Sequence, residues 1–531
     1  MKMLKRFVCA LLCVMLLLGA AYAETAVEGV TFHEGWEVYD ANIVFYEIFV
    51  GSFSDSDGDG IGDLRGIINR MDYLNDGDPQ SGLSLGVEGL WLTPIFRSPS
   101  YHKYDVTDYY TVDPQFGTKE DLQELAELCH ERGVKLILDL PINHTGNQCR
   151  WYKNFTNAHL MKNPDNAYYD FYTWIGAGDS IPAGRHFMRT GIGDMLVEAN
   201  FADTMPELNF DNEFVRETVL DVALTYLRLG VDGFRFDAAK YIYLNDNAAS
   251  VDFWTWYLGA LREEFPDMIA VAEVWDSDRI TDQYAAAVSC FNFTTSQASG
   301  LIAETAKAGD VNRWTAYLQN RMDALTAIGP DARNVPFIAN HDTDRAAGYL
   351  TVASGQMQMA ANLYILSPGA PFIYYGEEIG LRGSRGGSNT DANRRLAMLW
   401  GDGDTVSDPI GTDYDPTRQT PYSVADLKDT PSSLYNYYKK LLMIRRANPE
   451  IARGEFTALT FAGVKVGGFV STWNGSSVAV IHNTTQRTIS VDLADVTGLS
   501  FTEISAFVGF GTVTLEGTVL TLEGQTSAVL R

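Results

Sequence analysis

Gly233-Phe234-Arg235-Phe236-Asp237 is the stretch that decides the fold, because it is a short apolar run that ends by presenting an arginine and an aspartate. Two further acids end similar apolar runs: Glu273 within residues 270–275 and Asp342 within residues 337–342. In a barrel of parallel strands, the carboxyl ends of all strands meet at one face. We therefore expect these three carboxylates to converge at one end of a barrel.

Apolar strand-like runs alternate with helical patterns on both sides of this stretch, which predicts a parallel sheet buried on both faces. The strand-like runs are 43–50, 87–95, 134–142, 231–237, 269–275, 335–339 and 371–375, with an eighth expected near 287–293. The helical patterns between them are 121–132, 213–229, 253–265, 311–327 and 356–366. The count predicts an α/β fold of the (β/α)8 TIM-barrel type. A doubly wound open sheet is the alternative, but no dinucleotide-type glycine fingerprint follows the first strand.

The same patterns divide the chain into domains. We expect the barrel in residues 41–143 and 210–447, preceded by an N-terminal segment, residues 24–40. Residues 144–209, after the third strand, are rich in aromatic side chains, which argues against disorder and predicts a small inserted domain B with little helix. After Pro449, short alternating runs with Gly and Thr predict a C-terminal antiparallel β-sandwich domain, residues 448–531.

The first 23 residues have the pattern of a secretory signal peptide: basic residues, an apolar core at 7–18 and a small-x-small site ending at Ala23. We expect a secreted, extracellular or periplasmic, monomeric protein with no membrane span after signal removal. The net charge of −28, from 40 basic and 68 acidic residues, argues against a nucleic-acid partner. Cys129, Cys149 and Cys290 remain after cleavage, and they are an odd number without metal-ligand spacing.

Asp237 and Glu273 are about one strand–helix–strand unit apart, which places them on neighbouring strands. Hydrolysis of a glycosidic bond with retention needs a nucleophilic carboxylate and an acid/base carboxyl about 5–5.5 Å apart. Arg235 shares a strand face with Asp237 and would keep it ionised. Apolar neighbours would raise the pKa of Glu273 and keep it protonated as the acid. Any one of these acids taken alone is more often structural, so the prediction of a glycoside hydrolase depends on their convergence.

Six segments, ordered along residues 43–378, resemble signatures of the α-amylase family of glycoside hydrolases (family 13). Each segment alone is weak evidence for the family, but the six segments in this order are very specific to it. The segments are residues 86–94, Asp139-Leu140-Pro141-Ile142-Asn143-His144, Met205-Pro206-Glu207-Leu208-Asn209, Gly233-Phe234-Arg235-Phe236-Asp237-Ala238-Ala239-Lys240, Glu273-Val274-Trp275 and Asn340-His341-Asp342. The resemblance implies the fold described above and an α-glucan polysaccharide or maltooligosaccharide substrate.

The resemblance implies three catalytic carboxylates: the nucleophile Asp237, the acid/base Glu273, and Asp342, which would bind sugar hydroxyls and distort the ring. His144 and His341 would hydrogen-bond the same sugar. The other implied contacts are Tyr104 stacking under the ring, Arg235 orienting Asp237, Asp105 and Arg345 bracketing the far hydroxyls, and Lys240 touching the next sugar on the leaving-group side.

Three positions depart from the family's pattern. Tyr241 stands where the family often has His, which puts the leaving-group subsite in doubt. Glu207 stands where the inserted-domain motif usually has Asp, and Lys103 stands where a glycine precedes the stacking tyrosine. None of these departures removes a catalytic group.

Residues 55–63 place acids at alternate positions with interspersed glycines, a pattern that lets a short loop wrap oxygens around a hard cation. An EF-hand is excluded because its twelfth position, Gly66, is not Glu and no helix precedes the loop. Many members of the resembled family bind calcium in this first β–α loop. The alternative is an acidic turn that is exposed to solvent and binds no metal. We expect a structural Ca²⁺ whose ligands are Asp55, Asp57, Asp59, the Ile61 carbonyl and Asp63.

These expectations together predict a secreted, endo-acting α-amylase that cleaves α-1,4-glucosidic bonds in starch-like glucans with retention. The alternative enzymatic activity is that of a neopullulanase, cyclomaltodextrinase or α-glucosidase with transglycosylation. A remote alternative is a glucan-binding relative without catalysis. Such proteins usually lack one or more of the carboxylates, and this chain retains all three.

Overall fold

The computed structural model describes residues 30, 43–176, 178–387, 391–495 and 500–531. The predicted signal peptide, residues 1–23, lies outside the described residues, as does the segment 24–40 apart from Val30. In the described part of the chain, no helix is both long and apolar enough to cross a membrane.

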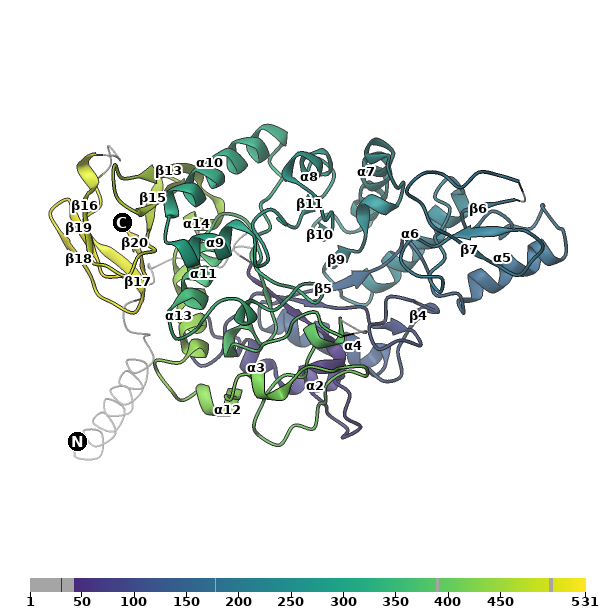
Figure 1. The fold of residues 1–531 in the computed structure, drawn as a ribbon, viewed down its shortest axis with the longest axis horizontal. Coiled ribbons are helices and arrows are strands. Elements are labelled where there is room, and N and C mark those ends of the chain that lie inside the picture. The colour runs from purple at the N-terminus through teal and green to yellow at the C-terminus, as the bar shows by residue number, and fades with distance from the viewer. Residues whose placement is uncertain (1–29, 31–42, 177, 388–390, 496–499) are drawn as a thin grey trace, which may run out of the picture.

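Parallel strands form the central sheet in the order β11-β10-β9-β5-β2-β1-β12. Their bounds are β1 (Phe45–Ile48), β2 (Gly89–Leu92), β5 (Lys135–Leu140), β9 (Gly233–Phe236), β10 (Ile269–Ala272), β11 (Ser289–Cys290) and β12 (Phe372–Tyr374). Residues 335–337 close the ring, because Val335 bridges to Phe291 and Phe337 bridges to Phe372. The chain therefore folds as the expected (β/α)8 barrel (Figure 1).

The seventh position of the barrel differs from the expectation. Residues 335–339 form only isolated bridges where a strand was predicted. Pro336 explains part of this, since it has no N–H to donate to a neighbouring strand. Its carbonyl still accepts a hydrogen bond of 3.0 Å from the Phe372 amide, which keeps the segment in the ring.

Helices cover the outside of the barrel, and most of the longer ones bury one apolar face. The longer ones are α4 (Lys119–Glu131), α6 (Glu213–Leu227), α7 (Asn247–Glu264), α10 (Val311–Ile328), α11 (Gln356–Ile365) and α13 (Leu434–Ala447). The shorter ones are α2 (Leu64–Asn69), α3 (Met71–Leu74), α8 (Asp278–Tyr284), α9 (Leu301–Ala308), α12 (Val424–Leu427) and α14 (Glu450–Arg453). α7 begins before the predicted residue 253 because the Asp246 side chain caps it by accepting from the Ala249 amide.

Residues 144–209 extend from one end of the barrel as α5 (Arg150–Leu160) and a small antiparallel sheet (Figure 1). The sheet pairs β8 (Leu196–Glu198) with β6 (Trp174–Ile175) and β7 (Phe187–Arg189). The expectation of little helix here is wrong for α5. Its buried face is largely aromatic, and Cys149 provides no side-chain cap, so the usual signals of a helix are weak.

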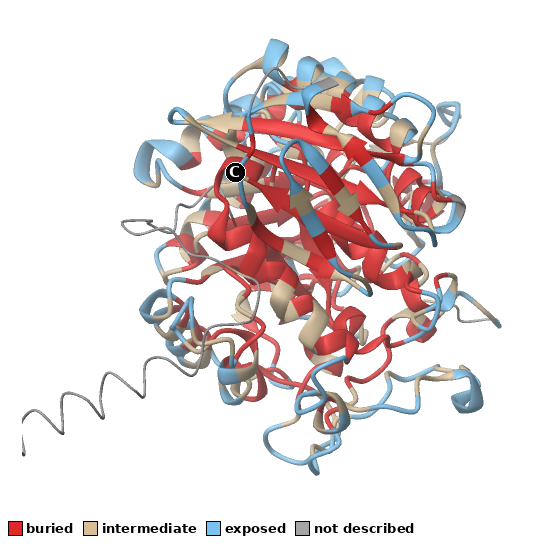
Figure 2. Ribbon diagram, turned by 90° about the vertical axis from the view of Figure 1, so that its left-hand side faces the viewer, coloured by how far each residue is buried: buried red, intermediate tan, exposed pale blue. Residues whose placement is uncertain are grey.

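Two antiparallel sheets form the C-terminal part of the chain, and Figure 2 views the molecule from this side, with buried residues along the strands. The larger sheet has the order β13 (Glu455–Thr460), β14 (Val466–Trp473), β15 (Ser476–Asn483), β20 (Thr526–Leu530) and β17 (Ile504–Gly509). The smaller has the order β16 (Ile489–Asp492), β19 (Val519–Leu522) and β18 (Val513–Glu516). Apolar residues of both sheets share one core, as expected for a sandwich.

Candidate active site

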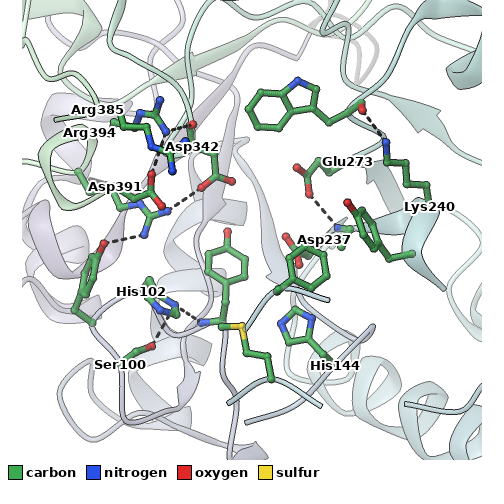
Figure 3. Close-up of a pocket in the computed structure, with 18 of the residues that line it drawn as sticks. Ser100, His102, His144, Asp237, Lys240, Glu273, Asp342, Arg385, Asp391 and Arg394 are labelled. Atoms are coloured by element: carbon green, nitrogen blue, oxygen red, sulfur yellow. Dashed lines mark hydrogen bonds and ion pairs between the residues drawn. The ribbon is translucent and has the colours of Figure 1, made fainter. Parts of the chain in front are cut away.

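A pocket of about 1000 Å³ opens at the carboxyl ends of the barrel strands. Asp237 follows β9, Glu273 follows β10 and Asp342 follows the segment 335–337, and all three line this pocket (Figure 3). β9 and β10 are parallel neighbours, with Phe236 paired to Ala272. The next residues on each strand, Asp237 and Glu273, therefore lie side by side as the sequence predicts.

The Arg235 guanidinium lies beneath both of these acids and is fully buried. Its Nη1 donates to Asp237 Oδ1 at 2.6 Å, and its Nη2 lies 3.0 Å from Glu273 Oε2. Nη1 also donates to Asp139 Oδ1 at 2.9 Å, an acid at the end of β5 to which sequence reasoning assigned no role. One buried cation therefore orients two carboxylates, and a third acid holds that cation in place.

Burial raises the pKa values of both central acids above those of ordinary carboxyl groups. Burial raises the pKa of Asp237 to about 6, although Arg235 acts in the opposite direction. Burial raises the pKa of Glu273 to about 7, with Arg235 again opposing and the nearby carboxylates reinforcing it. Arg235 lowers the pKa of Asp237, as expected of a neighbouring cation, but burial has the larger effect and the pKa rises.

Asp342 is held by two cations. His341 Nε2 lies 3.1 Å from Asp342 Oδ2, and Arg395 Nη2 donates to Asp342 Oδ1 at 2.8 Å. On its other side, His341 Nδ1 contacts the buried Glu47 carboxylate at 2.5 Å. Burial lowers the pKa of His341, but Asp342 and Glu47 outweigh it and raise the value to about 10. Burial raises the pKa of Asp342, but His341 and Arg395 outweigh it and leave the value well below the usual range.

Tyr104 and His144 line the pocket, as the sequence predicts. The Tyr104 hydroxyl donates to Asp139 Oδ2 at 2.8 Å and lies 2.6 Å from His341 Nε2, which holds the phenol ring in place. Neither ring nitrogen of the buried His144 has a hydrogen-bond partner among the described residues. Burial lowers the pKa of His144 to about 4, so its neutral ring offers one donor and one acceptor to a ligand.

Two predicted contacts do not fit the structure, because Asp105 and Arg345 lie outside the described lining of this pocket. Asp105 Oδ1 accepts hydrogen bonds from the hydroxyls of Ser98 and Ser100. Arg345 is buried, and its guanidinium donates to the carbonyls of Arg394 at 2.9 Å and Tyr375 at 2.6 Å. The contacts described for both side chains are therefore with the protein itself.

Other predicted contacts are placed differently from the expectation. His341 is fully buried and absent from the described lining of the pocket, and its ring contacts Tyr104, Asp342 and Glu47. Lys240 does line the pocket, but its Nζ donates to the Trp275 carbonyl at 3.0 Å and to Asp276 Oδ2 at 3.2 Å. Arg395 also lines the pocket and donates to the Asp342 carboxylate; sequence reasoning missed it because it lies in an irregular segment far along the chain.

Comparison with known proteins identifies the family. The profile described as "Alpha amylase, catalytic domain" matches residues 47–454. The chain belongs to the α-amylase family. It is 34% identical to "Alpha-amylase 3" of Dictyoglomus thermophilum, over 85% of this chain and 87% of that protein. It is 29% identical to "Trehalose synthase/amylase TreS" of Mycobacterium tuberculosis, over 91% of this chain and 88% of the relative.

A solved structure with a similar sequence has the same fold. The structure of Eubacterium rectale Amy13B superimposes with a TM-score of 0.84 at 31% identity, and the match covers 93% of this chain and 96% of that one. The match extends beyond the barrel and therefore includes most of the inserted and C-terminal parts of the chain. The family resemblance inferred from the ordered signatures is confirmed.

Two of the three departures from the α-amylase family pattern have local compensation. Lys103 has a left-handed backbone, with φ of 65°, where glycine is usually preferred. Its buried ammonium donates to Asp113 Oδ2 at 2.9 Å and Gln115 Oε1 at 2.8 Å. Burial and the neighbouring Glu198 raise the pKa of Glu207 to about 8. Glu207 is therefore mostly neutral at pH 7, which reduces the cost of burying the longer acid.

In the acidic loop of this α-amylase family member, residues 55–63, three of the predicted calcium ligands lie close together. Carboxylate oxygens of Asp55, Asp57 and Asp63 all lie within 4.8 Å of one another. Gly58 and Gly60 have positive φ values of 86° and 90°, which let the loop curl around this point. Such a set of carboxylate oxygens suits a hard divalent cation. Asp59 lies outside this group, and its Oδ1 accepts from the Ile61 amide at 2.8 Å.

Proposed function

We propose that this protein is a secreted, endo-acting α-amylase that cleaves α-1,4-glucosidic bonds in starch and related α-glucans with retention. The observation that carries the proposal is the pairing of Asp237 and Glu273 on neighbouring strands over a shared Arg235. A relative that covers most of the chain is named an α-amylase, which supports this choice within the family. The signal-peptide pattern at residues 1–23 supports secretion, and a monomer remains our expectation.

We propose a role for each acid. Asp237, the acid with the lower pKa of the pair, attacks the anomeric carbon and forms a glycosyl ester. Glu273 donates its proton to the departing glycosidic oxygen and then removes a proton from the attacking water. Asp342, kept ionised by His341 and Arg395, accepts hydrogen bonds from hydroxyls of the distorted sugar. His144 binds the same sugar through its unpartnered ring nitrogens.

We also propose a structural Ca²⁺ in the loop of residues 55–63. Asp55, Asp57 and Asp63 would hold it, with Asp59 and the Ile61 carbonyl completing the predicted set. Bound there, the ion would neutralise the clustered carboxylates and stabilise the loop. No catalytic step depends on it, since none of the five residues lines the active-site pocket.

The alternative activity is that of a neopullulanase, cyclomaltodextrinase or α-glucosidase with transglycosylation. The specific observation that favours it is the open aromatic surface on the leaving-group side of the pocket, formed by Phe201 and Trp275. A non-catalytic glucan-binding protein is disfavoured because all three carboxylates are present and oriented.

Product analysis on amylose, pullulan and cyclodextrin, side by side, tests the proposal. An endo-acting α-amylase releases a ladder of short maltooligosaccharides from amylose and acts much more slowly on the other two. Preferential cleavage of cyclodextrin or pullulan would replace the proposal by the alternative. Absence of reducing-sugar release from all three, at any pH and with Ca²⁺ present, would refute a hydrolase.

A further inference from the structure

A second cavity, of about 600 Å³, lies in the inserted part of the chain, between the start of α5 and β7. In Figure 1 these two elements lie at the end of the molecule farthest from the C-terminal sheets. The volume of the cavity is in the range of small-molecule sites in proteins. The cavity shares no described lining residue with the catalytic pocket, so it is a separate site that the proposed mechanism does not use.

Tyr152 of α5 presents an unused hydrogen-bonding group to this cavity. Only 8% of the residue is exposed, and its ring is held by Phe155 and Tyr172, whose ring centroids are 5.8 Å and 5.2 Å away. Its hydroxyl has no hydrogen-bond partner among the described residues, and it is not one of the described polar atoms that are sealed from solvent. Because Tyr152 lines the cavity, a ligand there can bond to this hydroxyl. A largely buried hydroxyl is costly to leave without a partner, so such a ligand is favoured.

Two further side chains at the cavity are free to bind a ligand. Asn147 lies just before α5, and its side-chain amide makes no hydrogen bond in the described part of the chain. Arg189, the last residue of β7, is exposed, and its guanidinium pairs with no acid that the structure describes. Together with the Tyr152 hydroxyl, these groups offer both donors and acceptors to one ligand.

The charges and the apolar wall of the cavity select the kind of ligand. Asp203 pairs with His186 at 2.7 Å, and its carboxylate repels an anion that Arg189 would attract. Arg189 in turn disfavours a metal ion, for which the described lining offers one carboxylate and one imidazole. The buried Phe187 and Met188 add an apolar wall. A neutral ring that carries several hydroxyls and has an apolar face, such as a sugar, suits all of these groups.

The second cavity and the catalytic pocket share one wall. Residues 144–147 and 201–206 form this wall, and backbone hydrogen bonds of 2.8 Å and 3.0 Å join the two segments. Phe201 and Met205 line the catalytic pocket, whereas Asp203, between them, lines the second cavity. A ligand that contacts Asp203 therefore constrains the segment that also carries Phe201 and Met205.

We propose that this cavity is a second saccharide-binding site, which holds a maltooligosaccharide without cleaving it and stabilises the wall that it shares with the catalytic pocket. The choice of a maltooligosaccharide rests on the proposed α-glucan substrate. Tyr152, Asn147 and Arg189 hydrogen-bond hydroxyls of the bound sugar. Cleavage there is excluded because Asp203 is the one acid in the described lining, and hydrolysis of a glycosidic bond needs a pair of carboxyl groups.

Hydrogen–deuterium exchange of Asp237→Asn with maltotetraose tests the proposal, because this variant is expected to bind the saccharide without turnover. Residues 186–190 line only the second cavity, and the lining residues within 237–241 face only the catalytic pocket. Maltotetraose is expected to slow exchange in both segments. The saccharide concentration at half of the effect gives a separate Kd for each site.

Two further changes, each added to Asp237→Asn, identify the binding groups. Tyr152→Phe removes only the hydroxyl and is expected to raise the Kd measured at residues 186–190 roughly threefold. Arg189→Ala removes a charged donor and is expected to raise the same Kd roughly tenfold. The matched control is Arg262→Ala, which changes an exposed arginine of α7 outside both pockets and should leave both Kd values unchanged.

The possible results are distinguishable. Slower exchange at residues 237–241 alone overturns the second site and leaves the proposed function intact. An effect at residues 186–190 that is equally strong in Tyr152→Phe and Arg189→Ala also overturns it, since the effect would come from the catalytic pocket through the shared wall. Slower exchange at residues 186–190 with inorganic phosphate, but not with maltotetraose, would show an anion site instead. No hydrolysis of maltotetraose by the unmodified protein would count against the proposed function, whatever the exchange shows.

Discussion

Arg395 donates a hydrogen bond of 2.8 Å from Nη2 to Oδ1 of Asp342, and its other nitrogens are committed at the same time. Nε donates to the His341 carbonyl at 3.0 Å, and Nη1 donates to the Tyr101 hydroxyl at 3.1 Å. The guanidinium is buried, so these three contacts define one position for it. Asp342 is consequently fixed by an arginine that lies 53 residues further along the chain.

Arg395→Lys is expected to reduce kcat/KM on maltooligosaccharides roughly 10- to 100-fold, the effect of losing charged hydrogen bonds to a partly buried carboxylate. A lysine keeps the charge but cannot make all three directed contacts. Most of the loss should appear in kcat, because Asp342 acts on the distorted sugar. Steady-state kinetics and a melting curve of the same sample measure it.

The matched control is Arg313→Lys, which alters an exposed ion pair with Glu304 and should change neither quantity. If Arg395→Lys retained the kcat/KM of the unmodified protein, the arginine would not be needed to position Asp342.

Asp237→Asn is expected to lower turnover by about 1000-fold or more, because an amide cannot form the glycosyl ester. Glucan binding should persist, since the pocket lining is otherwise unchanged. Calorimetric titration with maltooligosaccharides and a sensitive assay of reducing ends give both readouts. Turnover within tenfold of the unmodified protein would exclude Asp237 as the nucleophile.

The pH dependence of kcat/KM follows from the two shifted carboxyls. Asp237 must be deprotonated, so activity should rise as pH increases through about 6. Glu273 must be protonated, so activity should fall as pH increases through about 7. The optimum should lie between these values, and the two apparent pKa values belong to the coupled pair.

Glu273→Gln is the control for the fall in activity on the alkaline side of the pH profile. Hydrolysis of starch should be lost, while fluoride release from α-maltosyl fluoride should survive and no longer fall above pH 7, because fluoride departs without a proton. A profile for the unmodified protein that stays flat from pH 5 to pH 9 would contradict both assignments.

Removal of divalent cations is expected to lower the melting temperature if residues 55–63 bind Ca²⁺. A bound ligand at 100 times its Kd stabilises a protein by about 2.7 kcal/mol. Differential scanning fluorimetry with a chelator, followed by added Ca²⁺, measures the effect. In Asp57→Asn the Ca²⁺-dependent increase should disappear, whereas in Asp267→Asn, an exposed acid elsewhere, it should remain. Identical melting curves with and without chelator would argue against the site.

The barrel was predictable because its strands are short, apolar and separated by helices. These patterns can be recognised in short stretches of sequence. Asp237, Glu273 and Asp342 were predictable for the same reason, since each ends one of these runs. The roles of Glu47 and Arg395 were not predictable. Glu47 lies inside the first strand, and Arg395 lies in an irregular segment without periodicity. Arg345 was assigned from the family resemblance, but its side chain is directed to the carbonyls of Tyr375 and Arg394.

The sequence by itself determined the parallel barrel, the family and the three acids at its mouth, because strand periodicity and ordered motifs are local properties. Only the tertiary structure decided that Arg395 faces Asp342, that Lys240 is already bound and that burial raises the pKa of Asp237 despite Arg235. These facts depend on which distant segments meet and on how completely they exclude water. Neither property is encoded in the spacing of residues along the chain.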